Sequence, residues 1–111
     1  MYISSIGLTT NQACAAVVAA LQEDLEINNF TFGSFPEVSA TWTGSLFSVW
    51  LKARGVKVGP VLLRAHDVRM ALWGKHRPGG TGLLAKIQPL VIELEHTYHR
   101  RRESPSQVVT L

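Results

Sequence analysis

The stretch from Gly59 to Gly74 constrains the fold most strongly, because it carries the clearest amphipathic pattern in the chain. Apolar residues recur there at steps of three and four positions, as they do on one face of a helix. They are Val61, Ala65, Val68 and Leu72. Proline is favoured at the first helical position and glycine just past the last turn, and Pro60 and Gly74 fit both preferences. The sequence therefore predicts a helix over residues 60–73.

A second helix is predicted to begin after Thr9 and to run to about Leu25. Thr9 and Gln12 have the spacing of a capping box, in which each side chain satisfies an unpaired backbone amide. The apolar stripe comprises Ala13, Ala16, Val17, Ala20 and Leu21. Glu23 and Asp24 lie near the carbonyl end, where acids oppose the helix dipole. We expect this end either to fray or to meet Lys or Arg from the second half of the chain.

The central region has a different pattern, with aromatic residues and period-two alternation that predict a small hairpin or short strands near residues 30–43. The segment from Ser45 to Arg54 fits two interpretations. It is either a helix that ends at Gly55, or a strand that turns at Arg54 and Gly55 into a second strand. We favour the helix, which makes residues 45–73 a helix–turn–helix-like unit.

The last helix is predicted to begin after Thr81 and to continue along a stripe formed by Leu84, Ile87, Val91, Leu94 and Tyr98. Pro89 either bends this helix or divides it in two, and the continuous stripe favours a bend. The predicted fold is mainly α, with about four helices and the small β element, and α+β is the alternative. We expect a single domain over residues 1–104 and a short tail over residues 105–111. The tail is either loose or adds a strand to a neighbouring subunit.

Charge is distributed unevenly along the chain. Residues 1–50 contain four acids and no Lys or Arg, whereas residues 51–111 contain four acids and all 11 Lys and Arg residues. A basic half is typical of proteins that bind nucleic acid. It equally suits subunits that meet acidic face to basic face. The overall composition, 46% hydrophobic and 17% charged, is that of a globular domain.

Targeting signals and membrane spans are not expected from this sequence. No segment has the roughly 18 consecutive apolar residues that a membrane span needs. The N-terminus lacks the basic start of a secretory signal. A cytoplasmic location is therefore expected, or a place in the virion if a virus encodes the protein. The single Cys14 has no basic neighbour in the sequence and is expected to be a buried thiol.

Residues with catalytic or metal-binding potential are few. Glu93, His96 and His99 are spaced as metal ligands on one helical face, but further ligands would have to come from other helices. The serines and Cys14 lie in no recognisable nucleophile motif. We expect no enzymatic activity, no cofactor and no metal site.

The favoured hypothesis is a small regulatory protein that binds DNA or another nucleic acid through its basic second half. The residues predicted to contact nucleic acid are Arg64, Arg69, Lys75, Arg77, Arg100, Arg101 and Arg102. The alternative is a structural or adaptor protein, such as a virus particle component or a viral or plasmid accessory protein, that forms homo-oligomers. Its interface is predicted to comprise Phe30, Phe32, Phe35, Trp42 and Trp50. A third hypothesis is a small inhibitor that binds one protein target.

Overall fold

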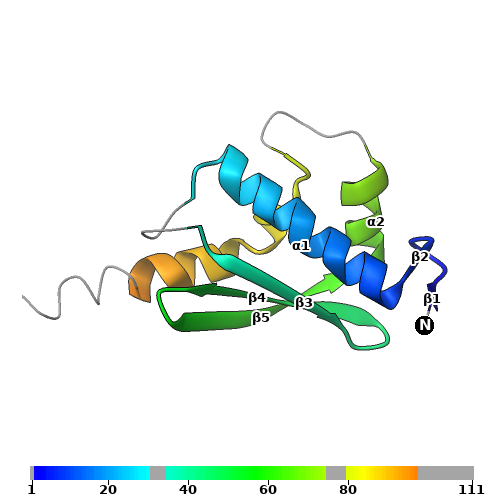
Figure 1. Ribbon diagram of the computed structural model, residues 1–111, viewed down its shortest axis with the longest axis horizontal. Coiled ribbons are helices and arrows are strands. Elements are labelled where there is room, and N and C mark those ends of the chain that lie inside the picture. Colours follow the sequence, from blue (N-terminus) through cyan, green and yellow to red (C-terminus); the bar gives the residue numbers. More distant parts are fainter. Residues whose placement is uncertain (1, 31–34, 75–79, 98–111) are drawn as a thin grey trace, which may run out of the picture.

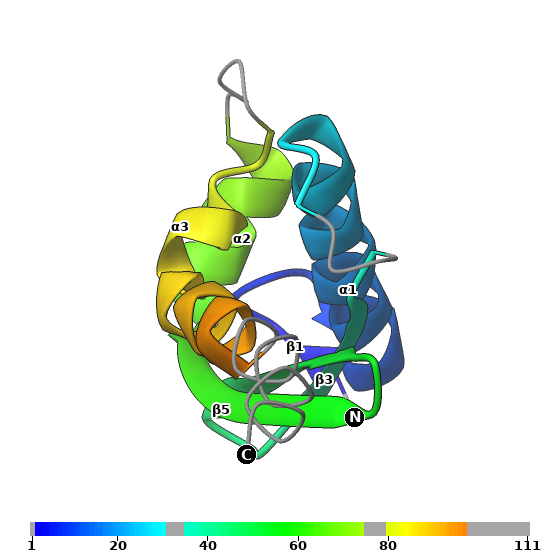
Figure 2. The ribbon, with the colours of Figure 1, turned by 90° about the vertical axis from the view of Figure 1, so that its left-hand side faces the viewer.

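The computed structural model describes residues 2–30, 35–74 and 80–97, and within these ranges the chain has an α+β fold. A three-stranded antiparallel sheet in the order β3-β4-β5 forms one layer. The described helices all lie on one side of this sheet (Figures 1 and 2). The prediction of a mainly helical fold is therefore wrong, because residues 46–53 and 56–64 are strands rather than helices.

The first helix, α1 (Thr10–Ile27), confirms the predicted capping box. The Gln12 backbone amide donates to the Thr9 hydroxyl at 3.2 Å, and the Gln12 side chain accepts from the Thr9 amide at 3.0 Å. A short hairpin precedes the helix, and each of its strands has two residues: β1 (Tyr2–Ile3) and β2 (Leu8–Thr9). The helix is therefore specified locally at its start, and it ends two residues beyond the predicted boundary.

The sheet comprises β3 (Glu37–Trp42), β4 (Leu46–Ala53) and β5 (Val56–Arg64). In β4, Phe47, Val49 and Leu51 alternate with less buried residues and point into the core, where each has no exposed surface. A helix would place these three side chains on different faces, so the predicted helix over residues 45–54 is wrong. The strand interpretation with its turn at Arg54 and Gly55 is correct, because both residues adopt positive φ angles that suit a tight hairpin.

The predicted helix over residues 60–73 is half right. Its first five residues belong to β5, and α2 (Ala65–Trp73) begins only at Ala65. Pro60 lies where the pairing of β4 with β5 is irregular, between Val49 and Leu51 of β4. Proline is tolerated at a bulge of an edge strand as well as at a helix start. Pro60 therefore marks an irregular position in β5 and not the start of a helix.

The last helical region is divided rather than bent. α3 (Leu83–Lys86) is followed by Ile87 as its C-terminal cap, and a further helix is described over residues 88–97. Pro89 lies in the first turn of the second piece, where its missing amide breaks no helical hydrogen bond. The favoured bend is wrong, and the alternative of two helices is correct. The apolar stripe continues across the break because Leu84, Ile87 and Val91 all face the core.

The core lies between the sheet and the helices, and α1 packs mainly on the edge strand β3. In Figure 2 the helices occupy the concave side of the curved sheet. α1 contributes Val17, Leu21 and Leu25 to this core, and residues 88–97 contribute Leu90, Val91 and Leu94. Both layers thus share one hydrophobic core, and the other side of the sheet is left without a described helix.

Asp24 fixes the position of α3 relative to α1. Its side chain is fully buried and accepts hydrogen bonds from the Thr81 amide at 2.7 Å, the Thr81 hydroxyl at 2.8 Å and the Leu84 amide at 3.2 Å. The carboxylate therefore caps a helix on a distant part of the chain. The expectation that the acidic end of α1 frays or meets Lys or Arg is wrong for Asp24, because backbone amides and a hydroxyl are its partners.

Candidate nucleic-acid interface

The side of the sheet that faces away from the helices, called the outer sheet face below, is built by alternate residues of the three strands. Residues with even numbers in β4 point outward, and the register places their neighbours from β3 and β5 beside them. The face comprises Glu37, Ser39, Thr41, Leu46, Ser48, Trp50, Lys52, Lys57, Leu62 and Arg64. It thus combines an aromatic ring, polar side chains and three cations.

Trp50 lies on the middle strand of this face, opposite the irregularity in the pairing of β4 with β5. Gly59 and Pro60 of β5 stand opposite Trp50, where β4 has a single residue. A Cβ atom on Gly59 would come within 2.9 Å of the indole ring, so the absence of a side chain lets the ring lie against the β5 backbone. The Lys57 ammonium lies 5.2 Å from the centre of the Trp50 ring, within cation–π range.

Charge is divided between the two layers of the fold. Residues 37–64, which form the sheet and its turns, contain four Lys and Arg residues and one acid. The described helices contain six acids and two basic residues, Arg69 and Lys86. Charge is therefore uneven in space as well as along the sequence. The division in space falls between the sheet and the helices, and not between the two halves of the chain. Within the described residues the sheet is basic, and the helices of both halves of the chain are acidic.

Arg64 lies at the end of β5, where it pairs with the first turn of α2. Its Nε lies 3.2 Å from an Asp67 carboxylate oxygen, and the Lys86 Nζ lies 4.0 Å from the other. The hydrogen bond from Arg64 and the charges of Arg64 and Lys86 lower the pKa of Asp67, against the raising effect of burial. Two of the described cations are thus partly neutralised by one carboxylate. Lys52 and Lys57 are the cations of the outer face that no described ion pair includes.

Only Arg64 and Arg69 of the predicted nucleic-acid residues lie in the described part of the chain, and they do not lie together. Arg64 belongs to the sheet layer, whereas Arg69 is an exposed residue of α2 in the helical layer. The other predicted contacts fall outside the described residues: Lys75, Arg77, Arg100, Arg101 and Arg102. Sequence reasoning missed Lys52 and Lys57. The strand interpretation of residues 46–52 predicts that Lys52 and Trp50 lie on the same face, because side chains two positions apart in a strand point the same way.

The predicted aromatic interface is dispersed. Phe30 is partly buried against the core, and Trp42 packs on Phe47 with ring centres 4.7 Å apart. Phe35 is 46% exposed, and Phe32 falls outside the described residues. Of the four that the structure describes, Trp50 is the residue that lies on the outer sheet face. The described members of the predicted interface, Phe30, Phe35, Trp42 and Trp50, are thus not gathered into one surface.

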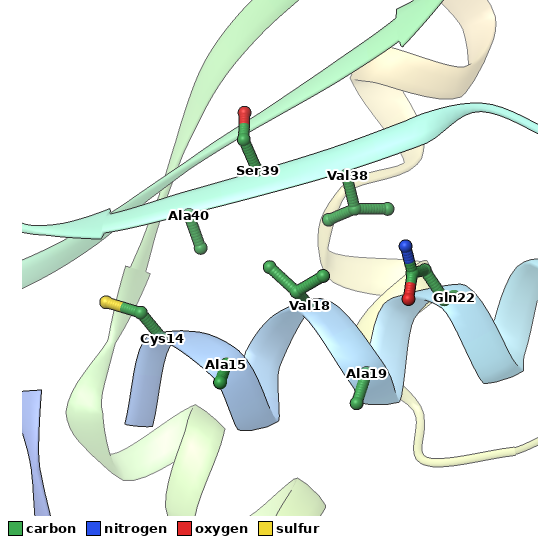
Figure 3. A pocket seen from close by; sticks show the side chains of 8 residues that line it. All are labelled: Cys14, Ala15, Val18, Ala19, Gln22, Val38, Ser39 and Ala40. Atoms are coloured by element: carbon green, nitrogen blue, oxygen red, sulfur yellow. The ribbon is translucent and has the colours of Figure 1, made fainter. Parts of the chain in front are cut away.

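Hollows also lie between the described elements, away from the outer sheet face. The first, called the β3 groove below, runs between α1 and the free edge of β3 and is lined mainly by small side chains (Figure 3). Half-buried Cys14 lies at one end of it, where burial raises the pKa of the thiol. The thiol was expected to be buried, and the structure shows it only partly buried. The second hollow lies between α2 and residues 80–86, and Asp67 and Lys86 line it.

Neither hollow offers recognisable catalytic chemistry. Among residues 2–30, 35–74 and 80–97, no three His, Cys, Asp or Glu side chains gather where they could hold a metal ion. His99, which has the spacing of a metal ligand relative to Glu93 and His96, lies outside these ranges. None of the described helices has the length and hydropathy to cross a membrane.

Comparisons of this chain with models of protein families, with curated proteins and with solved structures give no match.

Proposed function

We propose that this protein binds single-stranded nucleic acid on the outer sheet face, without catalysis and without a cofactor. The observation that carries the proposal is the position of Trp50 beside Lys52 and Lys57 on the one sheet face that no described helix covers. An aromatic ring stacks on an unpaired base, and nearby cations contact the phosphates on either side. The ten side chains of this face include one acid, Glu37, at the edge.

The open sheet favours a single strand over a duplex, and the charge of the helices favours the sheet as the side that nucleic acid contacts. Bases in a duplex are stacked on each other and expose only their edges, whereas a ring on an open sheet can reach only the face of an unpaired base. The acidic helical layer would repel phosphates from the opposite side of the molecule, which leaves the sheet as the basic approach. The nucleic-acid hypothesis is therefore kept, with the contact residues moved from the predicted set to the sheet.

The test compares two double variants that remove the same charge from different layers. Lys52→Gln with Lys57→Gln removes two cations from the outer sheet face, and Arg69→Gln with Lys86→Gln removes two from the helical layer. Binding of a fluorescent oligothymidine to the full chain is measured by anisotropy over a range of salt concentrations. Each lost phosphate contact lowers the slope of log affinity against log salt by roughly 0.7 for a single strand. The sheet variant should therefore lose a slope of roughly 1.4.

The helical-layer variant should retain most of the slope, because its residues face away from the proposed site. A third variant, Trp50→Leu, should weaken binding about tenfold without changing the slope, since stacking contributes about 1–3 kcal/mol per base. Equal losses in the two double variants would show that net charge alone drives binding and would contradict the proposal. Absence of binding to the unaltered chain at low salt would also overturn it.

A further inference from the structure

The strand β3 has one unpaired edge among the described residues. It pairs with β4 on one side only, and the sheet ends there. An edge strand presents a row of unpaired amides and carbonyls, which can accept another strand. α1 lies beside this edge, so an incoming strand would enter the β3 groove between a helix and a sheet edge (Figure 3). Added strands in other proteins bind in this way through main-chain hydrogen bonds.

The β3 groove has room for a backbone because its walls carry short side chains. Ala15, Val18 and Ala19 of α1 face Val38 and Ala40 of β3 across a hollow of about 420 Å³. Neighbouring strands lie about 4.8 Å apart, so the added strand must come close to α1 as well as to β3. Small residues on α1 allow this approach. The lining is mostly apolar, so an occupant should carry apolar or β-branched side chains on the side that faces α1.

The two ends of the β3 groove differ in charge. Gln22 lies beside Val38, and Cys14 lies beside Ala40, so α1 and β3 run in opposite directions (Figure 3). Glu26 follows Gln22 by one helical turn, and Glu37 begins β3, so acids cluster at this end of the groove. No Lys or Arg occurs anywhere in residues 1–51. An occupant with a basic segment at this end is therefore favoured.

We infer that the β3 groove binds residues 100–111 of a second copy of this chain as a strand parallel to β3. This segment begins with three arginines, Arg100, Arg101 and Arg102. It ends with six residues that include Val108, Val109 and Thr110, a composition that favours a strand. With the arginines at the acidic end, the strand runs from Glu37 toward Trp42, which fixes the parallel direction.

The contact joins two different surfaces, the groove of one copy and the C-terminal segment of the next. Such a contact either closes when two copies exchange segments or continues from copy to copy. It leaves the outer sheet face uncovered, so it does not depend on the proposed nucleic-acid binding. In this contact the acidic end of the β3 groove of one copy meets the basic segment, residues 100–102, of another copy.

Cys14, the only cysteine of the chain, provides a direct test at the far end of the groove. Two synthetic peptides of residues 98–111 carry a cysteine activated with thionitrobenzoate, one with Thr110→Cys and one with Ser106→Cys. Disulfide exchange with Cys14 of the full chain releases a coloured thiolate, whose rate is measured. Parallel docking places position 110 near Cys14 and position 106 near Gln22. The Thr110→Cys peptide should therefore react about tenfold faster, because docking raises its effective concentration at the thiol.

The rate should also saturate with peptide concentration, and Ala19→Arg should remove the saturation by filling the groove and adding a positive charge. Ala85→Arg, at an exposed alanine of α3, is the matched control and should leave the rate unchanged. Faster reaction of the Ser106→Cys peptide would overturn the parallel direction. Equal, unsaturated rates for both peptides would overturn docking in the groove.

Light-scattering mass distinguishes a second copy from the chain's own segment as the occupant. The full chain should associate as its concentration rises, and Ala19→Arg should remain monomeric while keeping the circular dichroism spectrum of the unaltered chain. A full chain that is monomeric at millimolar concentration would overturn the assignment to a second copy.

Discussion

At the scale of single residues, the buried carboxylate of Asp24 accepts three hydrogen bonds that join α1 to the start of α3. Removing its carboxylate in Asp24→Ala leaves the Thr81 and Leu84 amides and the Thr81 hydroxyl without their acceptor. Buried donors without partners are costly, so we expect the free energy of unfolding to fall by about 3 kcal/mol. Urea denaturation followed by circular dichroism measures the change.

Glu23→Ala is the control for this prediction, because Glu23 precedes Asp24 on α1 but is exposed. It should change the free energy of unfolding by less than about 0.5 kcal/mol. Similar losses in the two variants would contradict the capping role of Asp24, since helix propensity and charge would then explain both.

At the scale of elements, the β4–β5 hairpin depends on its turn. Gly55 has a φ of 78°, and a Cβ atom there would meet nothing within 4 Å, so the requirement for glycine is conformational rather than steric. Gly55→Ala forces an L residue into the left-handed region and should lower the free energy of unfolding by about 1 kcal/mol. Thermal denaturation of the two proteins checks this value.

Gly55→Asn tests whether Gly55→Ala loses stability because of the backbone conformation or because any side chain is added. Asparagine tolerates positive φ better than alanine, so this variant should lose less than half as much stability as Gly55→Ala. An asparagine variant that is no more stable than the alanine variant would contradict the conformational explanation.

At the scale of the whole molecule, the two layers share one core and should unfold together. Leu21 is fully buried between α1 and the sheet, whereas Leu62 on the outer sheet face is 55% exposed. Leu21→Ala should lower the free energy of unfolding by about 3 kcal/mol through lost burial and a cavity. Leu62→Ala should cost less than about 1 kcal/mol because the site stays open to water.

Two signals test whether this unfolding is cooperative. Tryptophan fluorescence reports on Trp42 and Trp50 in the sheet and on Trp73 in α2, whereas far-ultraviolet circular dichroism is dominated by the helices. The two denaturation curves should coincide in both leucine variants, as expected for a two-state domain. Separate transitions would show that the layers are independent.

The sequence by itself determined the features that depend on a few neighbouring residues. The capping box of Thr9 and Gln12 specifies the start of α1, because both partners lie within one helical turn. The acidic and basic halves were also visible in the composition of the chain.

Only the tertiary structure decided whether residues 45–64 are strands, since their apolar pattern suits both a helix and a sheet. Burial of Phe47, Val49 and Leu51 against α1 and the other helices selects the strand. The same choice brings Trp50, Lys52 and Lys57 together, which no spacing along the chain could show. The division of charge between layers likewise depends on which elements pack together, because burial and packing are long-range effects whereas caps and turns are local.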